Sequence, residues 1–255
     1  MQVIKTLTIS LLLLLFSSIF TYGVEVTSRT DLSFDNALAE EQILYTEPKK
    51  IYISQVHTNN EDLKNDTQAW IRSIYYYSIT RLKLNDIPFN YLVDNSGNVY
   101  EVSKGGPGAN PGLQNGENIV LIGILDSSSS ITPRVASSLT ELVETLSYKY
   151  GIKGGSWDFV NLKIAKEEGQ RSYMLAESSK LPSMESITTA MNSVRWSDQE
   201  HLEYKASIVD VTYANELVIG QQLDVKVTVK NENDFPWFAD TKQIYISTLD
   251  GKDSI

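Results

Sequence analysis

An unbroken apolar run, NIVLIGIL at residues 118–125, restricts the fold more than any other stretch of the chain. A strand with one face in water alternates apolar and polar side chains, whereas this run has no polar residue after Asn118. Such a run is typical of a central strand that is buried on both faces. The pattern therefore predicts an α/β fold, with a central mixed β-sheet flanked by helices.

Two stretches show the apolar period of helices that could cover such a sheet. Between Asp62 and Lys83 the apolar residues recur at spacings of three and four, as on one face of an amphipathic helix. A second helix is predicted to begin at Thr132 and Pro133 and to end at Gly151. Residues 161–195 have an irregular helical pattern, in which Ser183 could cap a helix.

Further strands are predicted on both sides of the first helix. The β-rich residues 51–57 form one strand, and DIPFNYLVDNSGNVYEV at residues 86–102 reads as two strands joined by a turn at Asn95–Gly97. A loop rich in Gly and Pro follows at residues 103–117, where no regular element can persist. Loops of this kind often line binding sites.

The pattern changes after Trp196. ASIVDVTYA, QLDVKVTVK and KQIYIST, the last at residues 242–248, alternate apolar and polar residues between turn residues. We therefore predict a first domain at residues 48–196 and an all-β, Ig-like sandwich module at residues 197–255. About 55 residues are too few for a seven-stranded sandwich, so the module is expected to be truncated or small.

The first residues predict export. Residues 1–23 place Lys5 before a long apolar run and end in small residues around a possible cleavage site, which is typical of a signal peptide. The alternative is an uncleaved membrane anchor, because the run approaches the length that spans a bilayer. Both place the remaining chain outside the cytoplasm, secreted or in the cell envelope. Residues 24–47 are predicted to be a weakly ordered leader or linker.

Charge and cysteine content exclude some functions. The formal net charge is -10, and removal of residues 1–23 with Lys5 makes it -11. Nucleic-acid binding depends on clustered Lys and Arg, so the sequence argues against it. The chain has no Cys, and it therefore has neither disulfides nor a thiolate for catalysis or metal binding.

In its order of elements, the chain resembles the peptidoglycan recognition proteins and the zinc-dependent N-acetylmuramoyl-L-alanine amidases that share their fold. The resemblance covers about residues 48–195 and is strongest from Asp86 to Ile152, where DIPFNYLVDNSGNVYEV is similar to the family's hairpin DIGYNFLIDPDGRVYEGR. It implies an amidase-like domain with a groove for peptidoglycan or muropeptides. The hairpin would form one wall and the floor of that groove.

In active members of the family, the resemblance implies a zinc ion held by three ligands. The first is a His at the end of the first strand, the second a His in a GHRD-like turn, and the third a Cys or Asp before PG. Matching HT to HT in SQVHTNN places Val56 at the first position, whereas a shift by one residue places His57 there. One step along a strand moves a side chain to the opposite face, so the two registers differ and both stay open.

The other positions depart from the family's pattern. GGSWD places Ser156 at the second ligand position, and KLPS places Leu181 at the third. Phe89 stands where the family has a Tyr whose hydroxyl assists at the developing oxyanion. We therefore predict no catalytic residue and no cofactor. Zinc would be bound only in a rebuilt site, for which His57 and Asp158 are the candidates, since the only other His is His201, between the domains.

Six residues are predicted to contact a ligand in the groove. Asn110 stands where the family often has a His, and Trp157 could serve as a platform for a sugar or as packing for its loop. His57 could equally be a strand-end residue held by neighbouring backbone. The predicted ligand-binding residues are His57, Phe89, Asn90, Asn110, Ser156 and Trp157.

Three functions follow from these patterns. The first is a pseudoenzyme that binds peptidoglycan or muropeptides without hydrolysis. The second is an active N-acetylmuramoyl-L-alanine amidase with a rebuilt metal site. The third is a structural or interaction protein of the envelope, which would meet protein partners through the β-sandwich module.

Overall fold

The computed structural model describes residues 24–39, 44–126, 128–167, 170–198, 205–213 and 225–233. Residues 1–23, His201 and residues 242–248 lie outside these ranges, so the signal peptide and the last predicted strand stay predictions. No helix within the described ranges combines the length and the hydrophobicity that a membrane span requires.

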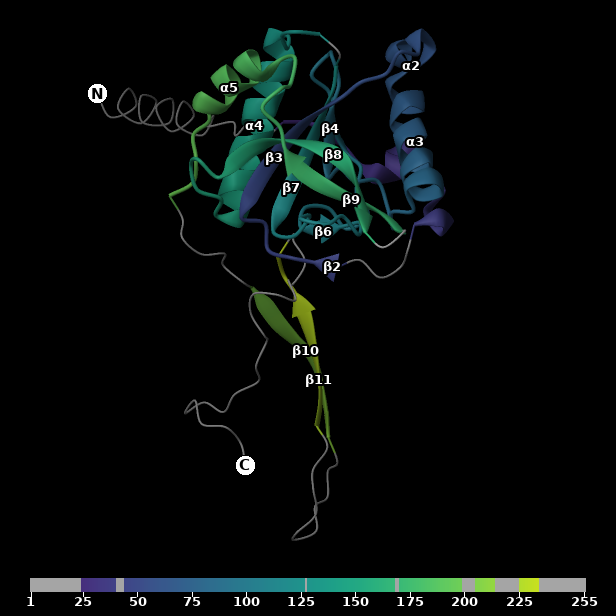
Figure 1. Cartoon of the computed structure of the whole chain (residues 1–255). Helices are drawn as coiled ribbons and strands as arrows, with labels where there is room; N and C mark the ends of the chain where they lie inside the picture. The colour runs from purple at the N-terminus through teal and green to yellow at the C-terminus, as the bar shows by residue number, and fades with distance from the viewer. Residues whose placement is uncertain are drawn as a thin grey trace, which may run out of the picture.

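A seven-stranded mixed sheet forms the centre of the first domain (Figure 1), in the order β1-β5-β4-β7-β3-β8-β9. Its strands β4, β7, β3 and β8 are parallel, β5 and β9 pair with β4 and β8 as antiparallel hairpins, and β1 runs parallel to β5. The bounds are β1 Val26–Thr27, β3 Lys50–Val56, β4 Tyr91–Val93, β5 Val99–Glu101, β7 Ile119–Leu125, β8 Trp157–Glu167 and β9 Gln170–Glu177.

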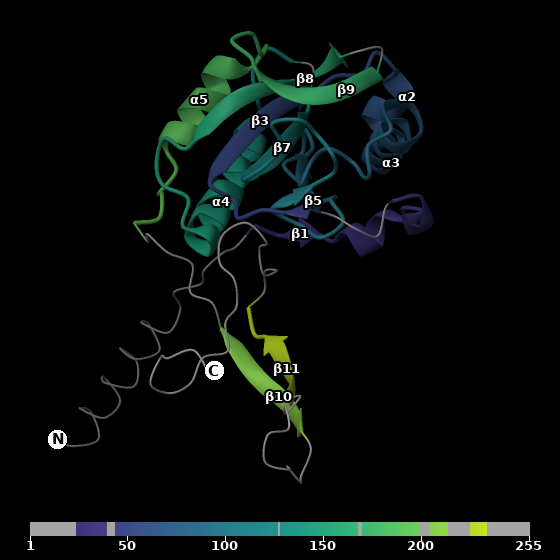
Figure 2. The same ribbon diagram turned by 60° about the horizontal axis from the view of Figure 1, so that its bottom comes forward.

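The apolar run that predicted a central strand is β7, which lies in the middle of the sheet with all of its residues buried. Successive side chains of the sheet point to opposite faces and enter two separate cores. Ile122 and Ile124 pack with helices α4 Pro133–Tyr150 and α5 Met184–Asn192. Leu121 packs on the other face with α3 Thr67–Tyr77. The predicted class, a mixed sheet flanked by helices, is confirmed (Figure 2).

One of the two periodic helices has the predicted ends, and the other is divided. In α4 the side chain of Thr132 accepts a hydrogen bond from the backbone N–H of Val135, and Gly151 ends the helix with a φ of 66°. The helix predicted between Asp62 and Lys83 is divided into α2 Glu61–Asn65, α3 and the π-helical turn η3 Ser78–Leu82. The division falls at Asp66, whose carboxylate caps α3 by accepting from the N–H of Ala69.

The prediction of helix at residues 161–177 was wrong, because this stretch forms most of the hairpin β8–β9. Side chains buried at every second position, Tyr173 and Leu175, show the period of a strand with one covered face. The helix predicted after Ser183 is present as α5, although the Ser183 hydroxyl makes no capping hydrogen bond.

The prediction of weak order at residues 24–47 was also wrong for the part that the structure describes. This segment contains β1, the short helices η1 Arg29–Leu32 and η2 Asn36–Leu38, and β2 Leu44–Tyr45, which pairs with β6 Ala109–Asn110. Leu32 and Phe34 are buried in the core beneath α3. Single apolar residues packed in this way produce no period, so the sequence pattern could not reveal them.

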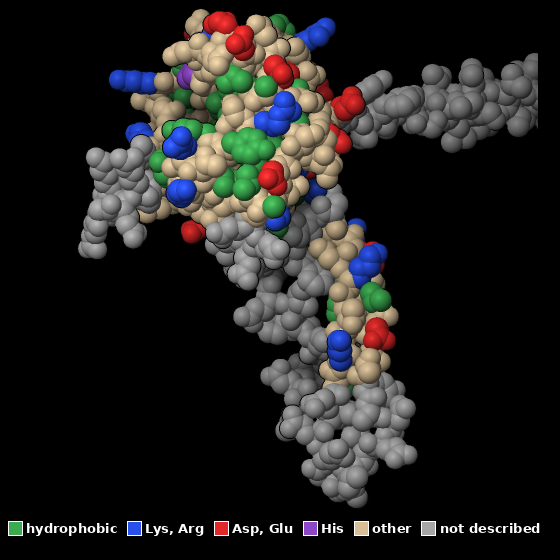
Figure 3. Space-filling view, turned by 90° about the vertical axis from the view of Figure 1, so that its right-hand side faces the viewer, with side chains coloured by type: hydrophobic (Ala, Val, Ile, Leu, Met, Phe, Trp, Pro, Cys, Tyr) green, Lys and Arg blue, Asp and Glu red, His purple; other side chains and the backbone are tan. Residues whose placement is uncertain are grey.

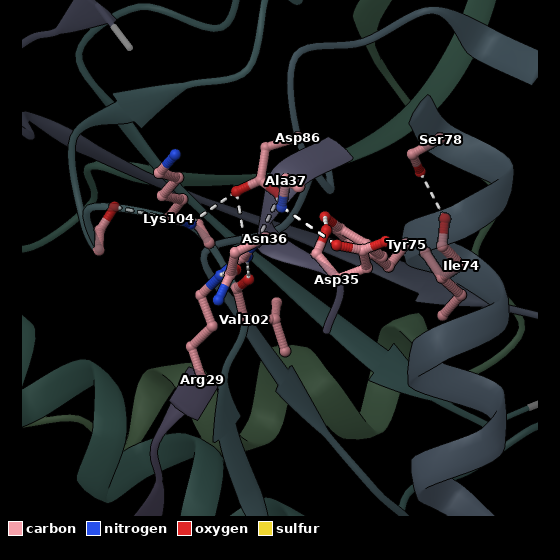
Figure 4. A network of polar contacts seen from close by, with 12 residues as sticks. Arg29, Asp35, Asn36, Ala37, Ile74, Tyr75, Ser78, Asp86, Val102 and Lys104 are labelled. Atoms are coloured by element: carbon pink, nitrogen blue, oxygen red, sulfur yellow. Dashed lines mark hydrogen bonds and ion pairs between the residues drawn. The ribbon is translucent and has the colours of Figure 1, made fainter. Parts of the chain in front are cut away.

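A buried ion pair fixes the same segment to the hairpin (Figure 4). Two nitrogens of Arg29 lie 3.0 and 3.1 Å from the carboxylate oxygens of Asp86, and Arg29 also donates to the carbonyl of Val102. The guanidinium lies 4.7 Å from the ring centroid of Phe34, which in turn stacks on Tyr75 of α3. The N-terminal segment therefore supports both the hairpin and α3.

In the region of the predicted β-sandwich, the structure describes a two-stranded antiparallel sheet of β10 Ala206–Tyr213 and β11 Val225–Asn231. It is drawn apart from the seven-stranded sheet in both ribbon views (Figures 1 and 2). The all-β character agrees with the alternating pattern. The Ig-like sandwich and its truncation stay predictions.

Candidate functional site

A cleft of about 800 Å³ lies between α3, the carboxyl end of β3 and the middle of β8. One part of its lining consists of apolar side chains from α3 and from the segment that leads into β4. Polar side chains of the two strands form another part. The residues used below are Gln55, Val56, His57, Trp70, Ile74, Tyr77, Phe89, Asn161 and Lys163. Its volume is within the range of pockets that bind small molecules in proteins.

Phe89, in the segment that leads into β4, is buried and forms part of the cleft wall. Its ring packs over Gly123 in the central strand, where an added Cβ would lie 2.8 Å from the Cδ1 atom of Phe89 and 2.6 Å from Leu92. This close approach explains why a glycine interrupts the apolar run of β7. The central strand and the cleft wall are thus shaped together.

Strand β3 brings Val56 and His57 to the cleft. Val56 is half-buried and His57 is exposed, and both line the same hollow, so both residues of the open register alternative belong to the site. Next to them, Gln55 is buried and its Oε1 atom accepts from the N–H of Ser183 at 3.2 Å. Its Nε2 atom has no hydrogen-bond partner in the part of the chain that is described.

Ser156, Trp157 and Asp158 lie at the opposite end of β3 from His57. The N–H of Ile51 donates to the carbonyl of Ser156 at 2.9 Å, and Trp157 and Asp158 pair with Ile51 and Tyr52. Six residues of extended strand separate Ile51 from His57, or roughly 20 Å. The structure therefore does not bring His57 and Asp158 together. The GHRD-like match misled because it aligned the start of β8 with a site at the carboxyl end of β3.

The local contacts of these residues are structural. Trp157 packs edge-on against Phe159, with 5.3 Å between the ring centroids. Asp158 lies 3.6 Å from the Nζ atom of Lys50 and accepts from the N–H of Phe159. Leu181, at the expected third ligand position, is buried in the core beneath α4 and α5. None of these side chains lines the cleft.

Asn90 and Asn110 are buried outside the cleft lining. The side chain of Asn90 accepts from the N–H of Leu121 at 2.8 Å and donates to the carbonyl of Gly106 at 2.9 Å. The Oδ1 atom of Asn110 accepts from the N–H groups of Gly112 and Leu113. Both amides hold the Gly-rich loop in place, so their predicted contact with a ligand is not supported by their position.

The cleft also contains residues that the sequence did not indicate. Asn161 and Lys163 of β8 were assigned to a helix, and the true strand places them beside the end of β3. Asn161 donates to the Oγ atom of Ser178 at 2.7 Å. Tyr77 of α3 lines the cleft, and 58% of its surface is exposed. Recognition of the alternating apolar residues in β8 could have found the first two.

The residues of the cleft do not fit a zinc site. Zinc in proteins takes three or four ligands from imidazole, thiolate and carboxylate groups. The cleft lining offers one imidazole, that of His57, together with hydroxyl and amide groups. Within the described residues, no three His, Cys, Asp or Glu side chains are grouped so that they could hold a metal ion.

The chain is similar to solved structures of peptidoglycan recognition proteins. For the Drosophila protein SD, the similarity covers 53% of this chain and 81% of that chain, with 14% sequence identity and a TM-score of 0.44. For peptidoglycan recognition protein LE in complex with tracheal cytotoxin, the similarity covers 52% of this chain and 79% of that chain, with 17% sequence identity and a TM-score of 0.44. For human PGRP-IBETAC in complex with glycosamyl muramyl pentapeptide, the similarity covers 52% of this chain and 81% of that chain, with 18% sequence identity and a TM-score of 0.41. No protein-family model and no curated protein matches the sequence.

Proposed function

We propose that the first domain binds peptidoglycan fragments in this cleft and does not hydrolyse them. The observation that carries the proposal is the lining of the cleft, which contains aromatic, aliphatic and polar side chains. The cleft lies beside the segment that leads into the hairpin, whose sequence resembles that of the family's hairpin. Muropeptides combine sugar rings, which have apolar faces, with peptide groups that form hydrogen bonds. A cleft of mixed character suits both parts.

Two features of the cleft match this ligand. Trp70 and Ile74 line it from α3, with Tyr77 exposed at its rim, so apolar surface is available to a sugar or an alkyl chain. Lys163 lines it from β8, and its ammonium group can donate hydrogen bonds to peptide carbonyl or carboxylate groups. The ligand would therefore lie between α3 and the strand ends.

The absence of hydrolysis is proposed from the chemistry of the side chains that are present. Amide hydrolysis by a zinc enzyme requires a metal that activates water and polarises the carbonyl. His57 alone cannot seat such an ion, and Phe89 lacks the hydroxyl of the tyrosine for which it stands. The domain is thus proposed to be an exported pseudoenzyme with an amidase-like fold.

Calorimetric titration of the purified protein with a defined disaccharide muropeptide tests the proposal, followed by mass spectrometry of the same sample after incubation with zinc. We expect saturable binding with one site and an intact muropeptide. Lack of binding would contradict the proposal. Release of the stem peptide that stops on addition of a chelator would instead support an active amidase.

A further inference from the structure

A second hollow, of about 490 Å³, lies at the β1 edge of the seven-stranded sheet, beside α4. Its walls come from the first described residues, from the turn that leads into β5 and from the middle of α4. The lining residues used below are Val24, Glu25, Gly97, Ser138 and Glu141. None of these residues lines the cleft beside α3, so this hollow belongs to a different part of the surface.

The fold holds Val24 in place at this hollow. Its side chain is half-buried and packs against the core beneath α4. Two residues further along the chain, β1 begins and pairs in parallel with β5. The turn at Gly97 is fixed to α4 as well, because the Oγ atom of Ser138 donates to the carbonyl of Gly97 at 2.6 Å. The position of the Val24 backbone is therefore set by contacts within the domain.

The charged side chains in the described lining of this hollow are both acidic. Glu25 is exposed, and Glu141 is half-buried and accepts from the Oγ atom of Ser137 at 2.9 Å. Further along α4, Glu144 pairs with Arg195 at 3.2 Å, whereas no Lys or Arg among the described residues pairs with Glu141. On the face over α2 and α3, by contrast, acidic and basic side chains are interspersed (Figure 3). The hollow is therefore suited to a cation.

Processing of the chain would supply such a cation. Small residues, Thr21 and Gly23, flank Tyr22, so the predicted cleavage falls between Gly23 and Val24. Hydrolysis of this peptide bond consumes one water molecule, leaves a carboxylate on Gly23 and frees the α-amino group of Val24. An α-amino group ordinarily has a pKa of about 7.7–8.0, so it is mostly protonated at pH 7. In the uncleaved chain the same nitrogen belongs to an uncharged amide.

We propose that removal of residues 1–23 creates an ammonium group on Val24 that binds in this hollow and pairs with the carboxylate of Glu141. The carboxylate of Glu25, in the adjacent residue, adds to the attraction. This inference goes beyond muropeptide binding, since it concerns how the exported domain matures. It also favours a cleaved signal peptide over an uncleaved membrane anchor, because cleavage gives Glu141 a cation that the anchored chain lacks at this position.

The first test is the N-terminus of the mature protein. The full chain is expressed in a bacterial host, and the exported protein is analysed by intact mass and N-terminal sequencing. We expect a protein that starts at Val24. Retention of residues 1–23, or a start at another residue, would overturn the inference.

The second test is unfolding in urea at low salt, where exposed charges are screened least. One form starts at Val24, and the other carries about ten Gly and Ser residues before it, so that the net charge is equal and the ammonium group is moved away. We expect the folded-to-unfolded equilibrium constant to be about threefold higher for the form that starts at Val24. Glu141→Gln is expected to remove this difference. Glu117→Gln, at an exposed position outside the hollow, is the matched control and should keep it.

A threefold difference that depends on Glu141 would support the ion pair. Equal stability of the two forms would overturn it, and so would a difference that persists in Glu141→Gln. Loss of the difference in Glu117→Gln would overturn it as well, because the effect would then reflect the total charge of the protein and not the carboxylate in the hollow.

Discussion

Tyr77 is the only aromatic residue of the described cleft lining that is largely exposed, because Trp70 and Phe89 are buried. An exposed aromatic ring at the rim of a cleft can cover the apolar face of a bound sugar. We expect Tyr77→Ala to weaken muropeptide binding by about fivefold, or about 1 kcal/mol, without loss of stability. Tyr148→Ala is the control, since Tyr148 is 53% exposed on α4 and outside the cleft. Equal effects of the two substitutions would contradict the role of Tyr77.

Asn90 can be a structural residue or a ligand-binding one, and substitution distinguishes the two. Asn90→Ala leaves the N–H of Leu121 and the carbonyl of Gly106 without their partner. Each unsatisfied buried group costs about 1–3 kcal/mol, so we expect a loss of about 3 kcal/mol in the free energy of unfolding, measured with urea. Asn59→Ala, in an exposed loop, should change it by less than about 0.5 kcal/mol. Unchanged stability with lost muropeptide binding would restore the ligand-binding interpretation.

Tyr100 makes the stability of the hairpin sensitive to high pH. Burial, and then the charge of Asp94, raise the pKa of Tyr100 to about 12. Above pH 10 the phenol ionises in the unfolded chain while it stays protonated in the folded one, so the unfolded state binds fewer protons and stability falls as pH rises towards 12. Urea midpoints at pH 9 and pH 11 should fall more for the unmodified protein than for Tyr100→Phe. Equal falls would contradict this assignment.

Among the elements, the N-terminal segment gives the clearest expectation. Arg29→Ala leaves the buried carboxylate of Asp86 without its cation, and removal of one partner from a buried ion pair costs about 3–5 kcal/mol. We therefore expect a loss of at least about 3 kcal/mol in the free energy of unfolding. Arg81→Ala, at an exposed position of η3, removes the same side chain as a control and should have little effect. Comparable stability of the two variants would show that the N-terminal segment is not an integral part of the domain.

Elements with a strong period could be predicted from the sequence, and elements held by single contacts could not. The apolar run of β7 and the capped, periodic helix α4 were found because local pattern and tertiary burial agree in them. The part of β8 after residue 160 was missed because apolar residues at every second position, separated by polar ones, resemble an irregular helix when the partner strand is unknown. That error displaced the site, since Asn161 and Lys163 lie in this strand.

The candidate site, like the fold, could be predicted only in part from the sequence. His57 and Phe89 follow from the strand end and the hairpin, which the pattern located correctly. The GGSWD match assigned Ser156, Trp157 and Asp158 to the site from the letters of a short motif. The register of β3 with β8 places them at the opposite end of β3 from His57. A motif of five residues cannot determine the register of a strand, because pairing depends on residues far away in the chain.

At the scale of the whole molecule, the described residues of the two cores all come from the first domain and the segment before it. Both cores share the central sheet, so α3 on one side of the cleft and the strands on the other are fixed to one scaffold. This arrangement suits a site that is formed before its ligand arrives. We therefore expect binding with little change in backbone structure.

We propose that a muropeptide binds between α3, the carboxyl end of β3 and the middle of β8, and that it stays intact. The most direct measurement is a titration of the isotopically labelled protein with a defined muropeptide, followed by backbone amide chemical shifts. We expect the shifts to change at residues 54–58 and 161–163, and the recovered muropeptide to have an unchanged mass. Changes concentrated at residues 156–158, or recovery of a free stem peptide, would contradict the claim.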